Sequence, residues 1–271
     1  MVLDKNKKNN SAYITELEDS IVDLSLRLKS KNIELSSYEK NSRILFGKLL
    51  HNLKNPVGVI YSFSEMILEY SKEPAPGKLE KHVDIINKSA AFSLKLLDSF
   101  SEYFNLFTSN TPFKYKPVNY IGFINTIVAQ FNDLIEDKKV KIEMVVPKEN
   151  VMLKIDSIRM TKAISNIITN GIRYSNDKAT IKIVIREKQD TIETEITDNG
   201  IGISESDLPH IFDEFFVVNT YSKDKEKCIG LGLAISNKII DEHRGKIKIK
   251  SALGKGSSFT ISLPKAEDIS I

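Results

Sequence analysis

The sequence predicts an α+β chain in which an N-terminal helical hairpin, paired with a second copy into a four-helix bundle, is followed by an α/β sandwich. Three observations predict this fold class. Apolar residues recur every three or four positions from Ile14 to Phe107. The polar segment "TSNTPFKYKPVN" then ends the helical pattern. Beyond it, strand-like segments with period-two alternation are interspersed with helical ones.

The first helix carries a coiled-coil heptad. Its apolar positions are Ile14, Leu17, Ile21, Leu24, Leu28, Leu35, Tyr38, Leu45 and Leu49. A period of 3.5 kept for over thirty residues favours a parallel dimer over a single amphipathic helix packed on its own domain. We therefore expect a coiled-coil signalling helix over residues 1–40 and a homodimer.

The helical hairpin is expected over residues 41–110. Its first helix ends near Tyr70 at "SKEPAPG", where two prolines and a glycine predict a turn, and its second runs from about Lys78 to Phe107. A linker at 111–118 then leads to a domain at 119–265. That domain is predicted to contain helices near 119–137, 157–175 and 232–243 and strands near 140–146, 150–156, 180–187, 191–198, 245–252 and 257–264.

Composition excludes several classes of protein. The 39 basic and 36 acidic residues give a net charge of +3 with no basic stripe, so we expect no nucleic-acid partner. The single cysteine, Cys228, leaves no disulfide or thiolate cluster. The sequence shows no signal peptide and no run of 18 apolar residues, so we expect a cytoplasmic protein without a membrane span.

The helix at 157–175 has two faces. Ile164, Ile167 and Ile168 share one side, and Asn166 and Asn170, with Arg173, cluster near the other. The polar stripe is either an ordinary solvated face or a set of amides that offer oxygens to a metal ion and hydrogens to phosphate.

Asp198 ends the strand "TIETEITD" on the same face as its buried isoleucines. A carboxylate there needs a donor, which the exocyclic amine of adenine provides; the alternative is a turn aspartate that caps the next segment. Gly200 and Gly202 follow it, and a second pair, Gly230 and Gly232, precedes a helix whose N-terminus attracts phosphate.

Between the glycine pairs lies "HIFDEFFVVNTYSKDKEKC". Phe212, Phe215 and Phe216 are its apolar anchors, and its lysine-rich tip either closes over a nucleotide or is simply a solvated loop. Upstream, "LLHNLKNPVG" places His51 in an apolar helical run just before Pro56.

Six segments follow one another along the chain: the one around His51, "NIITNGIRYS", "DNGIGI", "IFDEFF", "GLGLAIS" and "GKGSSFTISLP". On the order of these six segments, residues 41–264 resemble a sensor histidine kinase of two-component signalling. The resemblance implies a dimerisation and phosphoacceptor hairpin followed by an ATP-binding domain of the Bergerat type. It also implies ATP and Mg²⁺ as cofactors and a response regulator as partner.

The resemblance also implies residue roles. His51 corresponds to the phosphoacceptor, Asn55 to a water-orienting position, Asn170 to the magnesium ligand and Asp198 to the adenine contact. Asn166 and Arg173 correspond to phosphate-side residues. The remaining nucleotide-binding positions are Tyr174, Gly200, Gly202, Phe212, Phe215, Gly230, Leu231 and Gly232.

The implied function is autophosphorylation of His51 from ATP and transfer of the phosphoryl group to an aspartate of a response regulator. Two alternatives stay open: a nucleotide-binding phosphatase or dimeric scaffold of the same family, and a gyrase-type hydrolytic ATPase. The latter would call for a glutamate base where this chain has Asn166, and an amide cannot take a proton from water.

The chain departs from the family pattern at two positions. Asn52 stands beside His51 where Glu or Asp is usual, and Cys228 stands where the lid motif usually begins with glycine. The other histidines, His82, His210 and His243, lie outside the motifs and are expected at the surface or at helix caps.

Overall fold

The computed structural model describes residues 2–69, 78–108, 112–132, 140–175, 179–218 and 228–265. The chain divides into two compact units, residues 1–55 and 56–271. The expected hairpin turn at 71–77, the loop tip at 219–227 and the side chains of Ile14, Leu17 and Tyr38 lie outside the described residues. Within the described part of the chain, no helix combines the length and apolar composition needed to span a membrane.

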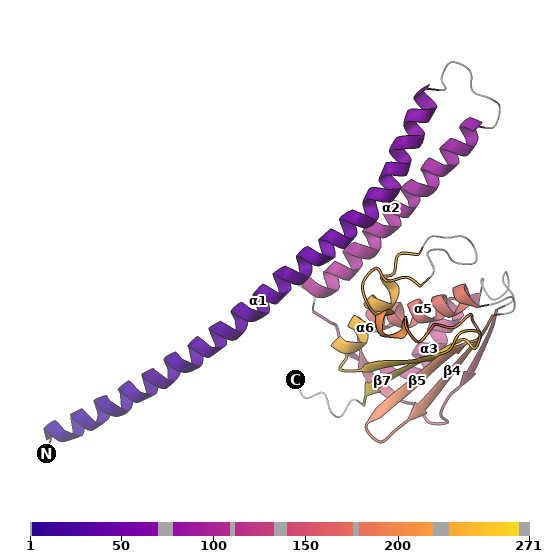
Figure 1. Cartoon of the computed structure of the whole chain (residues 1–271). Coiled ribbons are helices and arrows are strands. Elements are labelled where there is room, and N and C mark those ends of the chain that lie inside the picture. The colour runs from indigo at the N-terminus through magenta and orange to yellow at the C-terminus, as the bar shows by residue number, and fades with distance from the viewer. Residues whose placement is uncertain are drawn as a thin grey trace. The chain divides into compact units, whose positions relative to one another are not determined.

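Two long helices begin the chain, α1 (Val2–Glu69) and α2 (Lys78–Thr108). Both lie where the three- and four-residue spacing predicts them. In the second unit, the ring of Phe63 near the end of α1 packs edge-on against His82 of α2, with centroids 5.2 Å apart. The last turns of α1 therefore run antiparallel to α2, as Figure 1 shows.

A five-stranded sheet forms the centre of the following domain, in the order β2-β4-β5-β7-β6. Its strands are β2 (Lys141–Val145), β4 (Thr180–Glu187), β5 (Thr191–Asp198), β6 (Lys246–Ser251) and β7 (Ser257–Pro264). Strands β2 and β4 pair parallel, and the other neighbours pair antiparallel. The sheet is thus mostly antiparallel.

The helices cover one face of this sheet (Figure 1). They are α3 (Tyr120–Ala129), α5 (Ser157–Tyr174) and α6 (Gly232–Glu242), with a short 3₁₀ helix, η2 (Leu208–His210). Because strand side chains alternate between faces, Ile183, Ile196 and Ile261 are buried. On the opposite face Arg186 pairs with Glu195. This arrangement confirms the α+β fold class.

Two local differences from expectation lie at the start of the domain. Part of the expected linker at 111–118 is strand β1 (Lys116–Asn119), which pairs antiparallel with β3 (Met152–Ile155). Pro117 cannot donate a ladder hydrogen bond, but β1 has a neighbour on one side only and tolerates it. The helix expected over 119–137 is interrupted by a turn at Gln130 and Phe131, just after the end of α3, and residues 133–137 lie outside the described part of the chain. At the start of α3 the Asn119 side chain accepts from the backbone N–H of Gly122 at 3.2 Å.

Candidate functional site

Helix α5 presents its polar stripe to a cavity. The helix begins at Asp156, whose side chain accepts from the backbone N–H of Arg159 at 3.1 Å. One face, which includes Ile164 and Ile168, is fully buried in the core. The opposite stripe, from Lys162 through Asn166 and Asn170 to Arg173, lines a cavity of about 300 Å³.

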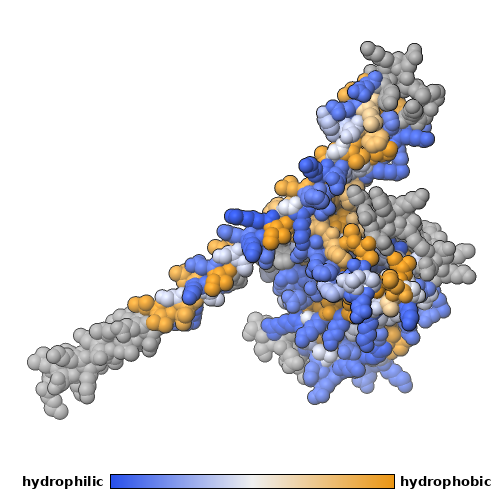
Figure 2. Space-filling model, in the orientation of Figure 1, coloured by the Kyte–Doolittle hydropathy of each residue, from blue (hydrophilic) through white to orange (hydrophobic). Residues whose placement is uncertain are grey.

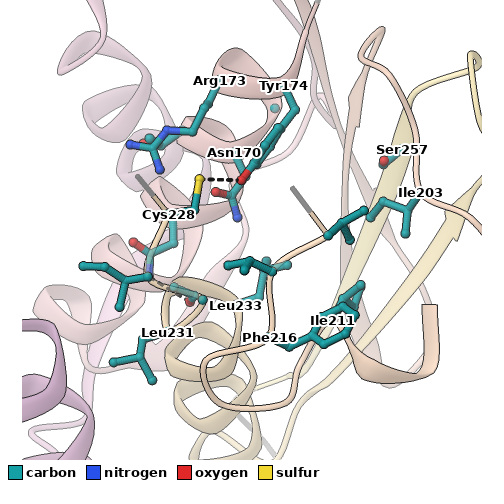
Figure 3. A pocket seen from close by; sticks show the side chains of 18 of the residues that line it. Asn170, Arg173, Tyr174, Ile203, Ile211, Phe216, Cys228, Leu231, Leu233 and Ser257 are labelled. Carbon is teal, nitrogen blue, oxygen red and sulfur yellow. Dashed lines mark hydrogen bonds between the residues drawn. The ribbon is translucent and has the colours of Figure 1, made fainter. Parts of the chain in front are cut away.

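The cavity collects residues from distant parts of the sequence. Nine of the expected nucleotide-binding residues line it: Asn166, Asn170, Arg173, Tyr174, Asp198, Gly202, Gly230, Leu231 and Gly232. In Figure 3, Asn170, Arg173, Tyr174 and Cys228 gather on one side of the cavity, and Ile203, Ile211 and Phe216 lie on the other. The site therefore joins a polar wall to an apolar one, which suits a ligand with a flat apolar ring and a polar tail.

Asp198 is the negatively charged residue of the cavity wall. Its Oδ1 accepts from the backbone N–H of Gly200 at 2.8 Å and of Ser257 at 3.1 Å. Burial raises the pKa of this carboxyl, and the two backbone hydrogen bonds oppose the rise. Because both bonds go to Oδ1, Oδ2 is the oxygen that a ligand donor would meet.

Two glycines hold the loops around the cavity in conformations that other residues rarely adopt. Gly202 has φ +70°, and a Cβ there would collide with the carbonyl oxygen of Ala252. Gly230 has φ +77°, and a Cβ there would lie 2.5 Å from the carbonyl oxygen of Phe216. Both glycines are required by the packing of the protein itself, whatever ligand the cavity holds.

Asn166 connects α5 to the glycine-rich start of α6. Its Nδ2 donates to the carbonyl oxygen of Gly232 at 3.0 Å. The hydroxyl of Ser236, one turn into α6, donates to the carbonyl oxygen of Ala163 at 3.0 Å. These bonds fix the N-terminus of α6 beside the polar stripe of α5, where its backbone N–H groups favour an anion.

Cys228, where the lid motif usually begins with glycine, lies in the cavity wall. Its Sγ is 3.0 Å from the hydroxyl of Tyr174, a hydrogen bond drawn in Figure 3. Burial and this bond raise the pKa of Tyr174, so the phenol stays neutral. The bond ties Cys228 to the end of α5.

Three expected nucleotide-binding residues do not line the cavity. Gly200 instead forms an isolated β-bridge with Ser175. Phe215 has φ 62°, and its backbone N–H donates to the carbonyl oxygen of Gly230 at 2.9 Å. Phe216 takes the place in the wall that was expected of Phe212 and Phe215. The sequence shows three phenylalanines close together, but it does not show the backbone turn that determines which of them lines the cavity.

Several lining residues were not predicted from the sequence. Lys162 lies one turn before Asn166 on the same stripe, so helical spacing alone could have identified it. Lys95 and Ser99 belong to α2, and Ser257 begins β7. These three come from distant segments, and no local pattern in the sequence indicates that they approach α5.

The charges of the wall are uneven. Among the described lining residues, Lys95, Lys162 and Arg173 are cationic and Asp198 is anionic. An adenine amine satisfies the carboxylate, and a polyphosphate satisfies the cations. The site therefore fits a nucleoside triphosphate.

A magnesium ion fits this site only together with phosphate. Among the described residues, no three acidic, histidine or cysteine side chains gather into a metal site. Mg²⁺ is commonly held by one or two protein oxygens plus substrate phosphates and water. Asn170, an amide in the cavity wall, is suited to be such a single protein ligand.

The expected phosphoacceptor segment lies on α1. His51 and Asn55 are exposed, four residues apart and hence on one helix face, and Asn52 is half-buried. Of the other histidines, His210 is exposed and pairs with Asp213, and His243 caps α6 but is buried with 4% of its surface exposed.

Comparisons with known proteins point to one family. Residues 155–267 match the family described as "Histidine kinase-, DNA gyrase B-, and HSP90-like ATPase". The chain is 28% identical over 247 residues to the sensor protein KdpD of Clostridium acetobutylicum, covering 89% of this chain and 27% of that protein. It is 22% identical over 265 residues to the sensor histidine kinase YvrG of Bacillus subtilis, covering 96% and 46%.

A solved structure shares the fold. The histidine kinase ThkA, in a crystal structure with the response regulator protein TrrA, superposes with a TM-score of 0.68 at 22% identity, covering 86% of this chain and 65% of that one. The chain spans 27% and 46% of the lengths of the two relatives named above.

Proposed function

We propose that this chain is a sensor histidine kinase with an ATPase domain of the histidine kinase, gyrase and HSP90 type. From this premise, it transfers the γ-phosphoryl group of ATP to His51. The observation that carries the proposal is the cavity that brings Asp198, Asn170 and the cations Lys95, Lys162 and Arg173 together. An aspartate of a response regulator then accepts the phosphoryl group, and ATP as substrate implies a cytoplasmic reaction.

Each wall residue has a role in this proposal. Oδ2 of Asp198 accepts from the adenine amine, and the cations Lys162 and Arg173 balance the charge of the phosphates. Asn170 would hold Mg²⁺, which would neutralise charge on the phosphates when bound. Asn166 is a positioning residue, because its amide holds the carbonyl of Gly232 at the start of α6.

In the reaction, an imidazole nitrogen of His51 attacks the γ-phosphorus. The bond from that phosphorus to the oxygen that bridges the β-phosphate breaks, and ADP leaves. The phosphorylated ring is cationic until the other ring nitrogen loses its proton to solvent. The exposed position of His51 on α1 suits a nucleophile that must meet ATP and later a second protein.

Two observations bear on the alternatives. Asn166 is an amide that donates to a carbonyl oxygen, so it cannot serve as the base of a gyrase-type hydrolase. Asn55 shares an exposed helix face with His51, which favours a phosphatase activity that orients water toward a phosphorylated regulator. If the chain has that second activity, Asn55→Ala should lower dephosphorylation of the regulator and leave phosphorylation of His51 intact.

We propose that the active form is a homodimer. The described heptad side chains in the first half of α1 are largely exposed, with 61% of Ile21, 63% of Leu24 and 64% of Leu28 accessible, whereas Leu45 and Leu49 are buried. Figure 2 shows orange apolar residues spaced along this part of α1. A second α1 in a coiled coil would bury these side chains.

The test of the proposed site is nucleotide binding measured by calorimetry. Asp198→Ala removes the adenine acceptor, so ATP affinity should fall with or without Mg²⁺. Asn170→Ala should mainly remove the magnesium-dependent part. Asn237→Ala, an exposed amide of α6 outside the cavity wall, is the control and should bind ATP as the parent does. Parent-like binding by Asp198→Ala and Asn170→Ala would remove both assignments.

A further inference from the structure

One face of α2 is directed at the ATP-binding domain. Lys95 and Ser99 line the cavity. Glu102 Oε2 lies 3.0 Å from Nζ of Lys162 on α5, and the hydroxyl of Tyr103 donates to Oε1 of Glu214 at 2.6 Å. The four α2 residues are separated by four, three and one positions, which places them along one side of the helix.

Tyr103 anchors this face. Only 3% of its surface is exposed, and burial together with the carboxylate of Glu214 raises the pKa of its hydroxyl. The phenol therefore stays neutral and donates to an ionised acceptor, which is a strong form of hydrogen bond. Glu214 lies two residues before Phe216, which itself lines the cavity, so the anchor lies next to the site.

The same face adds positive charge to the site. Lys95 is one of three cations in the cavity wall, and the other two, Lys162 and Arg173, belong to α5. Glu102 already pairs with Lys162 and offsets part of its charge. The triphosphate of ATP carries several negative charges, so a cation from a second helix has a clear electrostatic partner.

We propose that α2 forms one wall of the ATP site and that Lys95 contacts the polyphosphate of bound ATP. This inference rests on the proposed function only in taking ATP as the ligand. Its consequence is thermodynamic linkage: a change in the position of α2 alters the affinity for ATP, and bound ATP favours the position of α2 that brings Lys95 to the phosphates.

The test compares ATP with adenosine in the full chain. Lys95→Ala should weaken ATP binding about threefold to tenfold, the effect of one charge-assisted contact, and should leave adenosine binding unchanged. Lys88→Ala is the matched control, because Lys88 lies on the same helix, pairs with Asp84 at 2.6 Å and does not line the cavity. Ser99→Asp, which adds a negative charge to the same wall, should weaken ATP binding in the same selective way.

The outcomes separate this inference from the proposed function. Parent-like ATP binding in Lys95→Ala, or an equal loss of ATP and adenosine, overturns the contact between Lys95 and phosphate. A parent chain that binds ATP but forms no phosphohistidine contradicts the proposed function and leaves the inference standing. A parent chain that binds no ATP contradicts both.

Discussion

Asp198 is the residue in which protein stability and ligand binding are most clearly opposed. Its carboxylate is buried enough to raise its pKa, and its two hydrogen bonds come from neutral backbone N–H groups. A raised pKa means that the ionised carboxylate is less favourable in the folded protein than in the unfolded chain. The ionised group therefore lowers stability above its pKa, and we propose that its use lies in ligand binding.

Asp198→Asn should separate the two effects. The amide oxygen still accepts from Gly200 and Ser257, and the buried charge is gone, so the melting temperature at neutral pH should stay the same or rise. ATP affinity should fall about tenfold or more, because the amide presents donors to the adenine amine. Thermal unfolding and calorimetry check this, with Asp190→Asn in the exposed turn between β4 and β5 as control. A less stable variant that binds ATP normally would refute the role.

His243 shows a structural role that the sequence did not reveal. Its Nε2 accepts from the backbone N–H of Asp156 at 2.9 Å, and its Nδ1 donates to the carbonyl oxygen of Ile239 at 2.7 Å. The rings of Phe113 and Tyr115 pack edge-on against it at 5.5 and 5.2 Å. Only a neutral ring with its hydrogen on Nδ1 can make both bonds, so His243 joins α6 to the start of α5.

Acid should therefore destabilise this domain through His243. Burial lowers the pKa of its imidazole, despite the nearby carboxylates of Asp156 and Glu242, so the unfolded chain binds the proton more readily. The free energy of unfolding should be constant above about pH 6.5 and fall below it, by about 1.4 kcal/mol for each unit by which the pKa is lowered. Denaturant unfolding across this range measures the effect.

The control compares two histidine variants. His243→Gln should flatten the dependence on pH between about pH 6.5 and pH 5. His210→Gln, at an exposed histidine that pairs with Asp213, should leave that dependence as in the parent. An equally steep fall in His243→Gln would mean that another group causes it.

Helix α1 exposes several large apolar side chains. Leu24 and Leu26 are almost equally exposed, at 63% and 62%, but only Leu24 belongs to the heptad. If the second copy binds along the heptad, the two leucines differ in environment only in the dimer.

Leu24→Asp should therefore weaken the dimer by about tenfold or more in its dissociation constant, because a carboxylate in the seam loses apolar burial and pays for desolvation. Leu26→Asp, outside the seam, should dimerise like the parent. Sedimentation equilibrium at micromolar concentration distinguishes the two. Equal effects of both variants, or a monomeric parent, would contradict the coiled coil.

Long amphipathic elements were the most predictable from sequence. Helix α1 ends at Glu69 and α2 begins at Lys78, close to where the prolines and glycine of "SKEPAPG" predict these ends, and α5 and α6 lie where helical spacing predicts them. Strand β1 was not predicted, because Pro117 and its polar neighbours are typical of a linker and only the pairing with β3 makes the segment extended. Local patterns determine such elements only where the pattern is long.

The site was predictable to the extent that its motifs are local. Asn166, Asn170, Arg173 and Asp198 were found from periodicity and then by family resemblance, and all four line one cavity. Lys95, Ser99 and Ser257 were not found, because what brings them there is tertiary packing across most of the chain. Phe216 lines the cavity in place of Phe212 and Phe215, because the backbone turns at Phe215, which has a positive φ.

For the whole molecule, the rate of phosphorylation should depend on the residue beside His51. A carboxylate next to a reacting imidazole stabilises its positive charge, whereas the amide of Asn52 adds none. Pro56 lies inside α1 and removes the donor for the carbonyl of Asn52, which loosens the helix there. Asn52→Glu should therefore speed autophosphorylation by about tenfold, or about 1.4 kcal/mol of barrier. An unchanged or lower rate would show that the missing carboxylate is not limiting.

The most direct test of phosphoryl transfer to His51 is the fate of label from γ-labelled ATP in the full chain with Mg²⁺. The parent should acquire label that is labile in acid and stable in base, and His51→Ala should acquire none. His82→Ala, at the α2 histidine that packs on Phe63, should be labelled like the parent. Label that persists in His51→Ala would contradict the assignment of His51 as phosphoacceptor.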